Sequence, residues 1–182
     1  LLVCFIVGDT FFIGGGVVTE VNNDHSVYNF WSFNLKTKIW KQLNDFPVRV
    51  VRLWQQNSAC SLNGKGYVFQ YPDKLWEYTP VTDSWSEKVK FPGLFRETTK
   101  MVPVDDNIYL FGGYYSYLWN TCYKDSWNYS VSGNEWKLKA FMPHFTNYGV
   151  ALSYKNYVLV GLGYSNYGYT YFDEPIIYRL TL

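Results

Sequence analysis

Apolar and polar positions along the chain form a unit that occurs four times. Each unit has an apolar strand, a short polar turn and a second apolar strand that ends near glycine. The copies span residues 4–15, 60–70, 102–113 and 151–162. Gly8-Asp9, Asn63-Gly64 and Asp106-Asn107 supply residues that adopt the positive φ of tight turns, so each unit is predicted to begin with a β-hairpin.

Tryptophans carry a second pattern, downstream of the first three hairpins. A Trp-x-aromatic triplet is followed by another Trp nine residues after the first, and a proline comes seven residues later. The three copies are Trp31, Phe33, Trp40, Pro47; Trp76, Tyr78, Trp85, Pro92; and Trp127, Tyr129, Trp136, Pro143. In the fourth copy Ile176-Ile177-Tyr178 takes the place of the triplet. The two patterns together predict four strands per unit.

The repeat predicts the architecture. Aligning Gly14, Gln70, Gly112 and Gly161 gives periods of 56, 42 and 49 residues, as in proteins built from stacked units. One four-stranded sheet cannot bury both faces, so we predict propeller blades with the repeated tryptophans packed between them or placed at a blade edge. Cys4 and Cys60 are interpreted as equivalent buried positions. The predicted blades are residues 1–47, 48–92, 93–143 and an incomplete 144–182.

A complete propeller needs more chain than this. Six blades of this size require roughly 300 residues, whereas the sequence has 182. We therefore predict about three and a half blades of a six-bladed propeller, with the missing blades supplied by the rest of a parent chain or by a partner. A small four-bladed ring is the alternative.

Composition and charge limit the classes of partner that the chain can bind. Aromatic residues make up 21% of the chain and charged residues only 17%, which favours an all-β fold. Sixteen basic and fifteen acidic residues leave a net charge of +1, too little to hold a nucleic acid. The apolar runs are too short to span a bilayer. We expect neither a nucleic-acid partner nor membrane insertion.

The order Ile108-Tyr109-Leu110-Phe111-Gly112-Gly113, then Trp127-x-Tyr129, then Trp136 resembles the Kelch repeat. The stretches 75–85 and 91–96 look like blades of bacterial Kelch propellers, in particular surface-associated proteins of Bacteroidetes. The resemblance covers nearly the whole chain, although Gln70-Tyr71 and Gly161-Leu162 break the glycine doublet. It implies a Kelch-like β-propeller that is extracellular or on the cell surface, or cytoplasmic if the protein is an adaptor.

Ligand binding is expected on loops and at the ends of the propeller channel. Residues 114–120 and 164–174 form two equivalent aromatic-rich loops, and rigid aromatic rings with polar tips can stack on a sugar or anchor a peptide. The resemblance suggests that arginines just past the prolines line the channel and grip an acid. The alternative is a structural arginine bonded to carbonyls of the next blade. The predicted binding residues are Trp54, Arg49, Arg96, Tyr115, Trp119, Tyr164 and Tyr167.

Two functions remain open. The favoured one is a non-catalytic propeller that recognises a carbohydrate or protein ligand through its aromatic loops. The alternative is a carbohydrate-active enzyme of the galactose-oxidase-like or sialic-acid-epimerase-like Kelch kind, which would use Arg49, Arg96 and a tyrosine, with the remaining catalytic groups outside this chain. A copper site of the oxidase type needs two convergent histidines, whereas His25 and His144 lie on non-equivalent segments. We predict no catalytic residue, no metal site and no cofactor.

Overall fold

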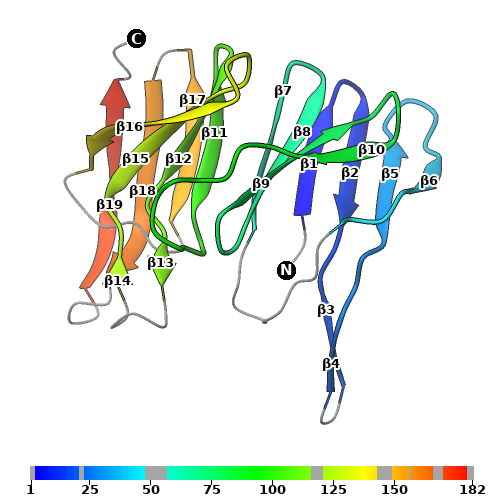
Figure 1. The fold of residues 1–182 in the computed structure, drawn as a ribbon, viewed down its shortest axis with the longest axis horizontal. Coiled ribbons are helices and arrows are strands. Elements are labelled where there is room, and N and C mark those ends of the chain that lie inside the picture. Colours follow the sequence, from blue (N-terminus) through cyan, green and yellow to red (C-terminus); the bar gives the residue numbers. More distant parts are fainter. Residues whose placement is uncertain are drawn as a thin grey trace. The chain divides into compact units, whose positions relative to one another are not determined.

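The computed structural model describes residues 3–20, 23–47, 57–115, 121–142, 149–155, 157–165 and 170–179. For residues 19–20, 23–25, 162–165 and 170–179 it describes the backbone alone. The regular elements in these ranges are β-strands, and no helix occurs in them. The prediction of an all-β chain is therefore confirmed. The chain divides into two compact units, Leu1–Lys88 (unit 1) and Val89–Leu182 (unit 2) (Figure 1).

Unit 1 contains two antiparallel four-stranded sheets. Sheet 1 has the order β1-β2-β5-β6, with β1 (Val3–Val7), β2 (Thr10–Gly14), β5 (Phe30–Asn34) and β6 (Trp40–Leu43). Sheet 2 has the order β7-β8-β9-β10, with β7 (Ser58–Leu62), β8 (Lys65–Gln70), β9 (Lys74–Thr79) and β10 (Ser84–Glu87). A small hairpin, β3 (Val17–Glu20) with β4 (Asn23–Ser26), lies between β2 and β5 in the sequence and extends beyond sheet 1 (Figure 1).

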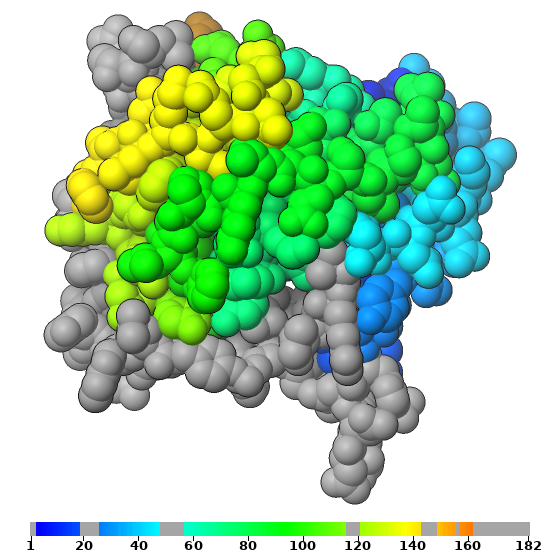
Figure 2. Space-filling view, in the orientation of Figure 1, coloured from blue at the N-terminus to red at the C-terminus, as the bar shows by residue number. Residues whose placement is uncertain are grey.

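Unit 2 contains one sheet of four strands and one of three. Sheet 3 has the order β11-β12-β15-β16, with β11 (Lys100–Val104), β12 (Asn107–Phe111), β15 (Asp125–Ser130) and β16 (Glu135–Phe141). Sheet 4 has the order β17-β18-β19, with β17 (Val150–Tyr154), β18 (Tyr157–Ser165) and β19 (Thr170–Arg179). A short hairpin, β13 (Tyr114–Tyr115) with β14 (Thr121–Cys122), joins β12 to β15. Figure 2 shows β16, in yellow, at the surface, where most of its side chains are exposed.

The tryptophan spacing has a direct structural cause. The aromatic of each triplet lies opposite the second Trp in the register of the third and fourth strands, as the pairs Phe33–Trp40, Tyr78–Trp85 and Tyr129–Trp136 show. The ring centroids of these pairs are 4.8, 4.8 and 5.1 Å apart, a distance at which aromatic rings attract each other. In sheet 4, Ile176 and Tyr178 pair with Val160 and Val158 and thus occupy the triplet positions. Each sheet falls inside one predicted blade segment, and the segment boundaries stay predictions.

The turns of the first hairpins correct part of the sequence alignment. Val104 pairs with Asn107, so the third turn is centred on Asp105-Asp106 and not on Asp106-Asn107. Asp105 itself has the positive φ, 50°. Asparagine and aspartate tolerate this conformation because their short polar side chains can bond locally. The predicted position was wrong by one residue because three polar residues follow each other there.

Counting from the turns also shifts the glycine alignment. Gly112 is equivalent to Gly15 and not to Gly14, since Gly15 and Gly112 have φ values of 69° and 55°. The following residues, Gly16 and Gly113, match as well, with φ values of 128° and 108°. The run of three glycines in the first copy made the alignment ambiguous. In sheet 4 the same count makes Leu162, and not Gly161, the equivalent of Gly112.

Within each unit, neighbouring sheets share one core. In unit 1 the core cluster consists of Val3, Phe5, Phe12, Phe30, Phe46, Val68 and Tyr78. In unit 2 it consists of Val102, Val104, Tyr109, Phe111, Met142, Val158 and Val160. The first strands of successive sheets are neighbours, β1 of β7 and β11 of β17. Face-to-face packing with adjacent first strands is consistent with propeller blades.

Cys4 departs from prediction, whereas Trp40 lies on an edge strand, which is one of the two places predicted for the repeated tryptophans. Counted from the turns, Cys4 is equivalent to Ala59 and not to Cys60, and one residue of shift moves a side chain to the opposite face of a sheet. Cys60 is buried, as predicted, whereas Cys4 is exposed. Trp40 is 54% exposed; Trp85, by comparison, contacts Phe46 at 4.9 Å.

Candidate functional site

The candidate site lies where the segment leading into β11 meets the β13–β14 hairpin. Glu97 and Tyr114 exchange two backbone hydrogen bonds, of 2.8 and 2.9 Å, across this junction. Gly113 makes the close approach possible, because a Cβ there would lie 2.8 Å from Thr99 Cγ2 and 2.9 Å from the Glu97 carbonyl oxygen. A loop that precedes a sheet is thereby fixed to a loop between its second and third strands.

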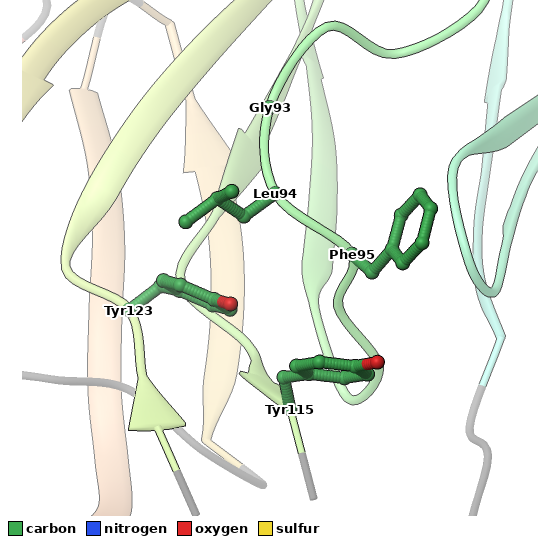
Figure 3. Close-up of a pocket in the computed structure, with 5 residues that line it drawn as sticks. All are labelled: Gly93, Leu94, Phe95, Tyr115 and Tyr123. Atoms are coloured by element: carbon green, nitrogen blue, oxygen red, sulfur yellow. The ribbon is translucent and has the colours of Figure 1, made fainter. Parts of the chain in front are cut away.

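A small pocket opens at this junction. It has a volume of about 170 Å³ and is lined by Gly93, Leu94, Phe95, Tyr115 and Tyr123 (Figure 3). Leu94 and Phe95 are 62% and 44% exposed and lie together at the pocket, and a cluster of exposed apolar side chains is typical of a binding surface. The rings of Phe95 and Tyr115 lie 6.3 Å apart in an edge-to-face arrangement. The pocket therefore offers aromatic surface that solvent can reach.

Arg96 lies beneath the pocket and is 1% exposed. Its Nη1 and Nη2 donate to the two carboxylate oxygens of Asp125 at 2.6 and 2.9 Å. Nη1 also donates to the Gly112 carbonyl oxygen and Nε to that of Leu94, at 3.2 and 3.0 Å. Arg96 thus ties the entering segment to β15 by charge-assisted bonds in two-pronged geometry. These contacts are structural, as the alternative expected, but the bonded carbonyls belong to the predicted segment of Arg96 itself and not to the next blade.

Two aromatic rings sandwich the Arg96 guanidinium. Its central carbon lies 4.9 Å from the ring centroid of Phe91 and 4.3 Å from that of Tyr123. Cation–π attraction at these distances strengthens when the groups are shielded from water. Arg96 therefore holds the Tyr123 ring in place as one wall of the pocket.

The Tyr123 hydroxyl forms no hydrogen bond with any of the described residues. Tyr123 is 8% exposed, and its Oη is buried with no hydrogen-bond partner among them. Desolvation raises the pKa of Tyr123, partly opposed by the charge of Arg96, so the phenol stays protonated and can donate. An unmade hydrogen bond of a buried group costs about 1–3 kcal/mol. A ligand hydroxyl or carbonyl would recover it only if the surrounding side chains moved, because this oxygen is buried.

A run of buried polar residues next to the pocket escaped the sequence reasoning. Glu97, Thr98 and Thr99 are 3%, 1% and 1% exposed. Thr98 has a φ of 59°, which for a β-branched residue costs about 1–3 kcal/mol and is typical of functional regions. The Thr99 hydroxyl is a second buried group without a partner in the described part of the chain. The available signal was four consecutive polar residues, 96–99, directly before a strand predicted to be buried.

Among the predicted binding residues, Arg96 and Tyr115 are brought to this one junction. Trp54, Arg49, Trp119 and Tyr167 lie outside the described residues. The backbone of Tyr164 pairs with Tyr171 in sheet 4, and its side chain lies outside the described part. Residues 114–120 follow β12, as predicted, but the prediction of a loop over residues 164–174 was wrong for most of its length, because β18 continues to Ser165 and β19 begins at Thr170. Residues 166–169 lie outside the described part.

Unit 1 holds a separate buried charge. Glu77 is 6% exposed and accepts hydrogen bonds from Lys65 Nζ and Tyr67 Oη, both at 2.8 Å. Desolvation acts to raise the pKa of Glu77, but these two bonds and the charges of Lys88 and Lys65 outweigh it, so the pKa is lowered. Because the carboxylate is satisfied internally, we interpret it as structural.

Several other chemistries find no support in the described residues. No group of three or more His, Cys, Asp or Glu side chains in them could hold a metal ion. Burial raises the pKa of the Cys60 thiol to about 12, which makes it a poor nucleophile. Over the same residues there is no helix of sufficient length and apolar character to cross a membrane.

Comparison with known proteins adds a distant relative. No family model matches the chain. The chain is similar to the N-acetylneuraminate epimerase of Pasteurella multocida (strain Pm70), with 29% identity over 155 residues. The match covers 77% of this chain, which spans 37% of the length of that relative. The all-β structure with four-stranded antiparallel sheets fits this distant homology.

Proposed function

We propose that the chain contributes consecutive blades to a six-bladed Kelch-like β-propeller that binds a carbohydrate through its aromatic loops without catalysing a reaction. The packing of sheets within each unit, the common tryptophan register and the similarity to N-acetylneuraminate epimerase support a Kelch-like propeller. The other blades come from the rest of a parent chain or from a partner.

The aromatic pocket with its unpartnered hydroxyl carries the binding part of the proposal. Phe95 and Tyr115 offer ring surfaces, and Tyr123 offers a donor that no described residue satisfies. A sugar ring has the complementary chemistry, with apolar C–H faces for the rings and hydroxyls at the rim for the phenol.

The pocket size limits the occupant. Pockets for larger ligands usually have volumes of roughly 300–1,000 Å³, whereas this one has about 170 Å³. It therefore accommodates one monosaccharide ring of a longer glycan. Trp119, which belongs to the same loop as Tyr115, and Tyr164 and Tyr167, which belong to the same unit, would extend the stacking surface to neighbouring sugar units.

Charge favours neutral sugars at this pocket. Its described lining carries no ionisable group other than two tyrosines, and the nearby Arg96 is neutralised by Asp125 at 2.6 Å. A carboxylate would find no free cation among these lining residues. A sugar acid would instead have to engage Lys90, whose Nζ lies 6.0 Å from the ring centroid of Phe95.

Binding to a glycan array, followed by calorimetry of the best neutral sugar and of N-acetylneuraminic acid, tests the proposal. The variant Tyr115→Ala should weaken the Kd by at least about fivefold, the equivalent of about 1 kcal/mol. Tyr28→Ala, which removes an exposed tyrosine of unit 1, serves as the matched control and should bind like the parent. Absence of carbohydrate binding, or equal Kd values for the two variants, would contradict the proposal.

The similarity to N-acetylneuraminate epimerase favours a second candidate, an enzyme of that kind. Conversion between the anomers of N-acetylneuraminate can be followed by proton NMR with and without the protein. An acceleration that scales with protein concentration would establish the enzyme and exclude the non-catalytic proposal. Neutral-sugar binding without acceleration would support the non-catalytic one.

The proposal also includes a location. A glycan-binding propeller of the bacterial surface type would lie outside the cell, as the resemblance to surface-associated Kelch proteins implies. Cell fractionation with detection of the full-length protein checks this point. Recovery in the cytoplasm would favour an adaptor-type Kelch protein instead.

A further inference from the structure

The Tyr123 hydroxyl is buried although its side chain lines an open pocket. Its Oη is shielded from water and has no hydrogen-bond partner among the described residues. Figure 3 shows the hydroxyl directed into the pocket, between Leu94 and Tyr115. A polar atom that faces a pocket and is nevertheless shielded must be covered by a neighbouring side chain. A ligand can therefore reach this hydroxyl only after a lining side chain has moved.

Tyr123 and Tyr115 are fixed walls of the pocket. The Tyr123 backbone N–H donates to the Gly113 carbonyl oxygen at 2.9 Å, and the ring centroid of Tyr123 lies 4.3 Å from the central guanidinium carbon of Arg96. Tyr115 pairs with Thr121 in the β13–β14 hairpin. Movement of either tyrosine would break contacts that hold the junction together, so neither is expected to open the pocket.

The backbone on the other side of the pocket is fixed as well. Phe91 and Arg96, which flank residues 92–95, are each 1% exposed. Arg96 Nε donates to the Leu94 carbonyl oxygen at 3.0 Å. A Cβ on Gly93 would lie 2.5 Å from the Phe91 ring and 3.2 Å from Arg96 Nη2, so this backbone packs directly on the two buried residues. Movement in residues 92–95 is therefore expected in the side chains.

Leu94 is the lining side chain that is able to move. It is 62% exposed, compared with 44% for Phe95, and the Phe95 ring contacts that of Tyr115 at 6.3 Å. Figure 3 shows the Leu94 side chain directed toward the Tyr123 ring. An exposed side chain changes rotamer within picoseconds to nanoseconds. Turning away from Tyr123 loses an apolar contact, but it allows the hydroxyl to form a hydrogen bond with water or a ligand.

We propose that Leu94 is a gate residue, which covers the Tyr123 hydroxyl in the empty pocket and turns outward for a ligand that hydrogen-bonds to this hydroxyl. The gate makes binding selective, because a ligand without a hydrogen-bonding group at this point gains nothing from displacing Leu94. Since such a ligand binds the open state, the closed state lowers both its association rate and its affinity. The inference rests on the carbohydrate proposal for the identity of the ligand alone.

Ionisation of Tyr123 tests the gate without any ligand. Desolvation raises the pKa of Tyr123 in the parent chain. Leu94→Ala should let water reach the hydroxyl, so the pKa should fall toward its usual value of 10.0. The substitution leaves Arg96, Asp125 and Tyr115, which also act on this pKa, unchanged. NMR of chains labelled at the tyrosine Cζ measures it, with the Tyr123 signal identified by its absence in Tyr123→Phe. An unchanged pKa in Leu94→Ala overturns the proposal.

Binding kinetics of the best neutral sugar separate a gate from an ordinary contact. Leu94→Ala should raise the association rate by at least about threefold and lower the Kd by the same factor, because more molecules have an open pocket. The same substitution in Tyr123→Phe should bring no gain, since the hydroxyl is absent. A weaker Kd through faster dissociation would make Leu94 an ordinary wall of the pocket and overturn the proposal.

Leu138→Ala is the matched control for both measurements. Leu138 is another exposed leucine of unit 2, at 48% exposure, and it does not line the pocket. The pKa of Tyr123 and the Kd should therefore equal those of the parent. Absence of sugar binding in every chain would contradict the carbohydrate proposal, and the titration of Tyr123 would then decide on the gate by itself.

Discussion

The ion pair between Arg96 and Asp125 offers a quantitative test of how the candidate site is held together. Asp125→Asn changes the charge and almost nothing of the shape. Arg96 would stay buried at 1% exposure, between the rings of Phe91 and Tyr123, without its counter-charge. The Trp127 indole, which donates to Asp125 Oδ2 at 2.7 Å, would keep a possible acceptor in the new side-chain amide.

The expected cost follows from the burial of the pair. Removing one partner of a buried ion pair usually costs about 3–5 kcal/mol. The amide oxygen introduced by Asp125→Asn would retain one acceptor, which places the loss at the lower end, near about 3 kcal/mol. The pair Lys137–Glu135 is the matched control, because its side chains are 60% and 50% exposed. Glu135→Gln should cost less than about 1 kcal/mol.

Urea unfolding followed by tryptophan fluorescence measures both values, since Trp127 lies at the site. The double variant Arg96→Met with Asp125→Asn completes a cycle. It should be less destabilised than the sum of the two single variants, because no uncompensated charge remains buried. Additive single losses, or a loss below about 1 kcal/mol for Asp125→Asn, would refute the argument that the pair is buried and coupled.

Three further predictions concern titration, thiol access and ligand contact. The pKa of Glu77 is lowered from its usual 4.5, so the free energy of unfolding should fall as the pH drops from about 6 to about 3, and Glu77→Gln should remove this dependence in urea titrations. A thiol reagent should modify Cys4 at once in the native chain but Cys60 only after unfolding, because Cys4 is exposed and Cys60 buried; equal rates would contradict the strand register. Tyr123→Phe should weaken binding of the carbohydrate by about fivefold in calorimetry, the value of one hydrogen bond, without lowering the melting temperature, since its hydroxyl has no partner among the described residues.

The sheets could be predicted from the sequence because the repeated residues contact each other in pairs across neighbouring strands. Tyr78 and Trp85 must face each other across a turn, and their spacing reappears at Tyr129 and Trp136. The glycine alignment failed by one residue at Gly14 because three glycines adjoin, and only the backbone φ values distinguish them. The exposure of Trp40 could not be predicted, since it depends on what packs against the sheet and not on the sheet itself.

The site was less accessible to sequence reasoning. Arg96 was singled out from its place after Pro92, but its partner Asp125 lies 29 residues away and is brought near by the pairing of β15 with β12. Tyr123 carries no local signal in a chain with 18 tyrosines. Tyr115 was identified because its loop holds more aromatic residues than strand packing needs. Which of these rings surround the pocket depends on the pairing of strands that are far apart in the sequence. Residue spacing alone does not reveal that pairing.

The turns between the third and fourth strands of sheets 2 and 3 accept a hydrogen bond from a neighbouring segment, whereas the equivalent turn of sheet 1 lacks a side chain that could accept one. Asp83 and Asn134 have a φ of 48° each and accept a hydrogen bond from Tyr78 Oη and Tyr129 Oη at 2.8 Å.

The same two side chains also accept a backbone N–H from a segment that packs beside their sheet, Asn44 for Asp83 and Val89 for Asn134, both at 3.1 Å. At the equivalent position sheet 1 has Lys38, with a φ of 61°, and a lysine side chain cannot accept a hydrogen bond. A segment packed beside sheet 1 would therefore lack the side-chain hydrogen bond that Asp83 and Asn134 accept in sheets 2 and 3.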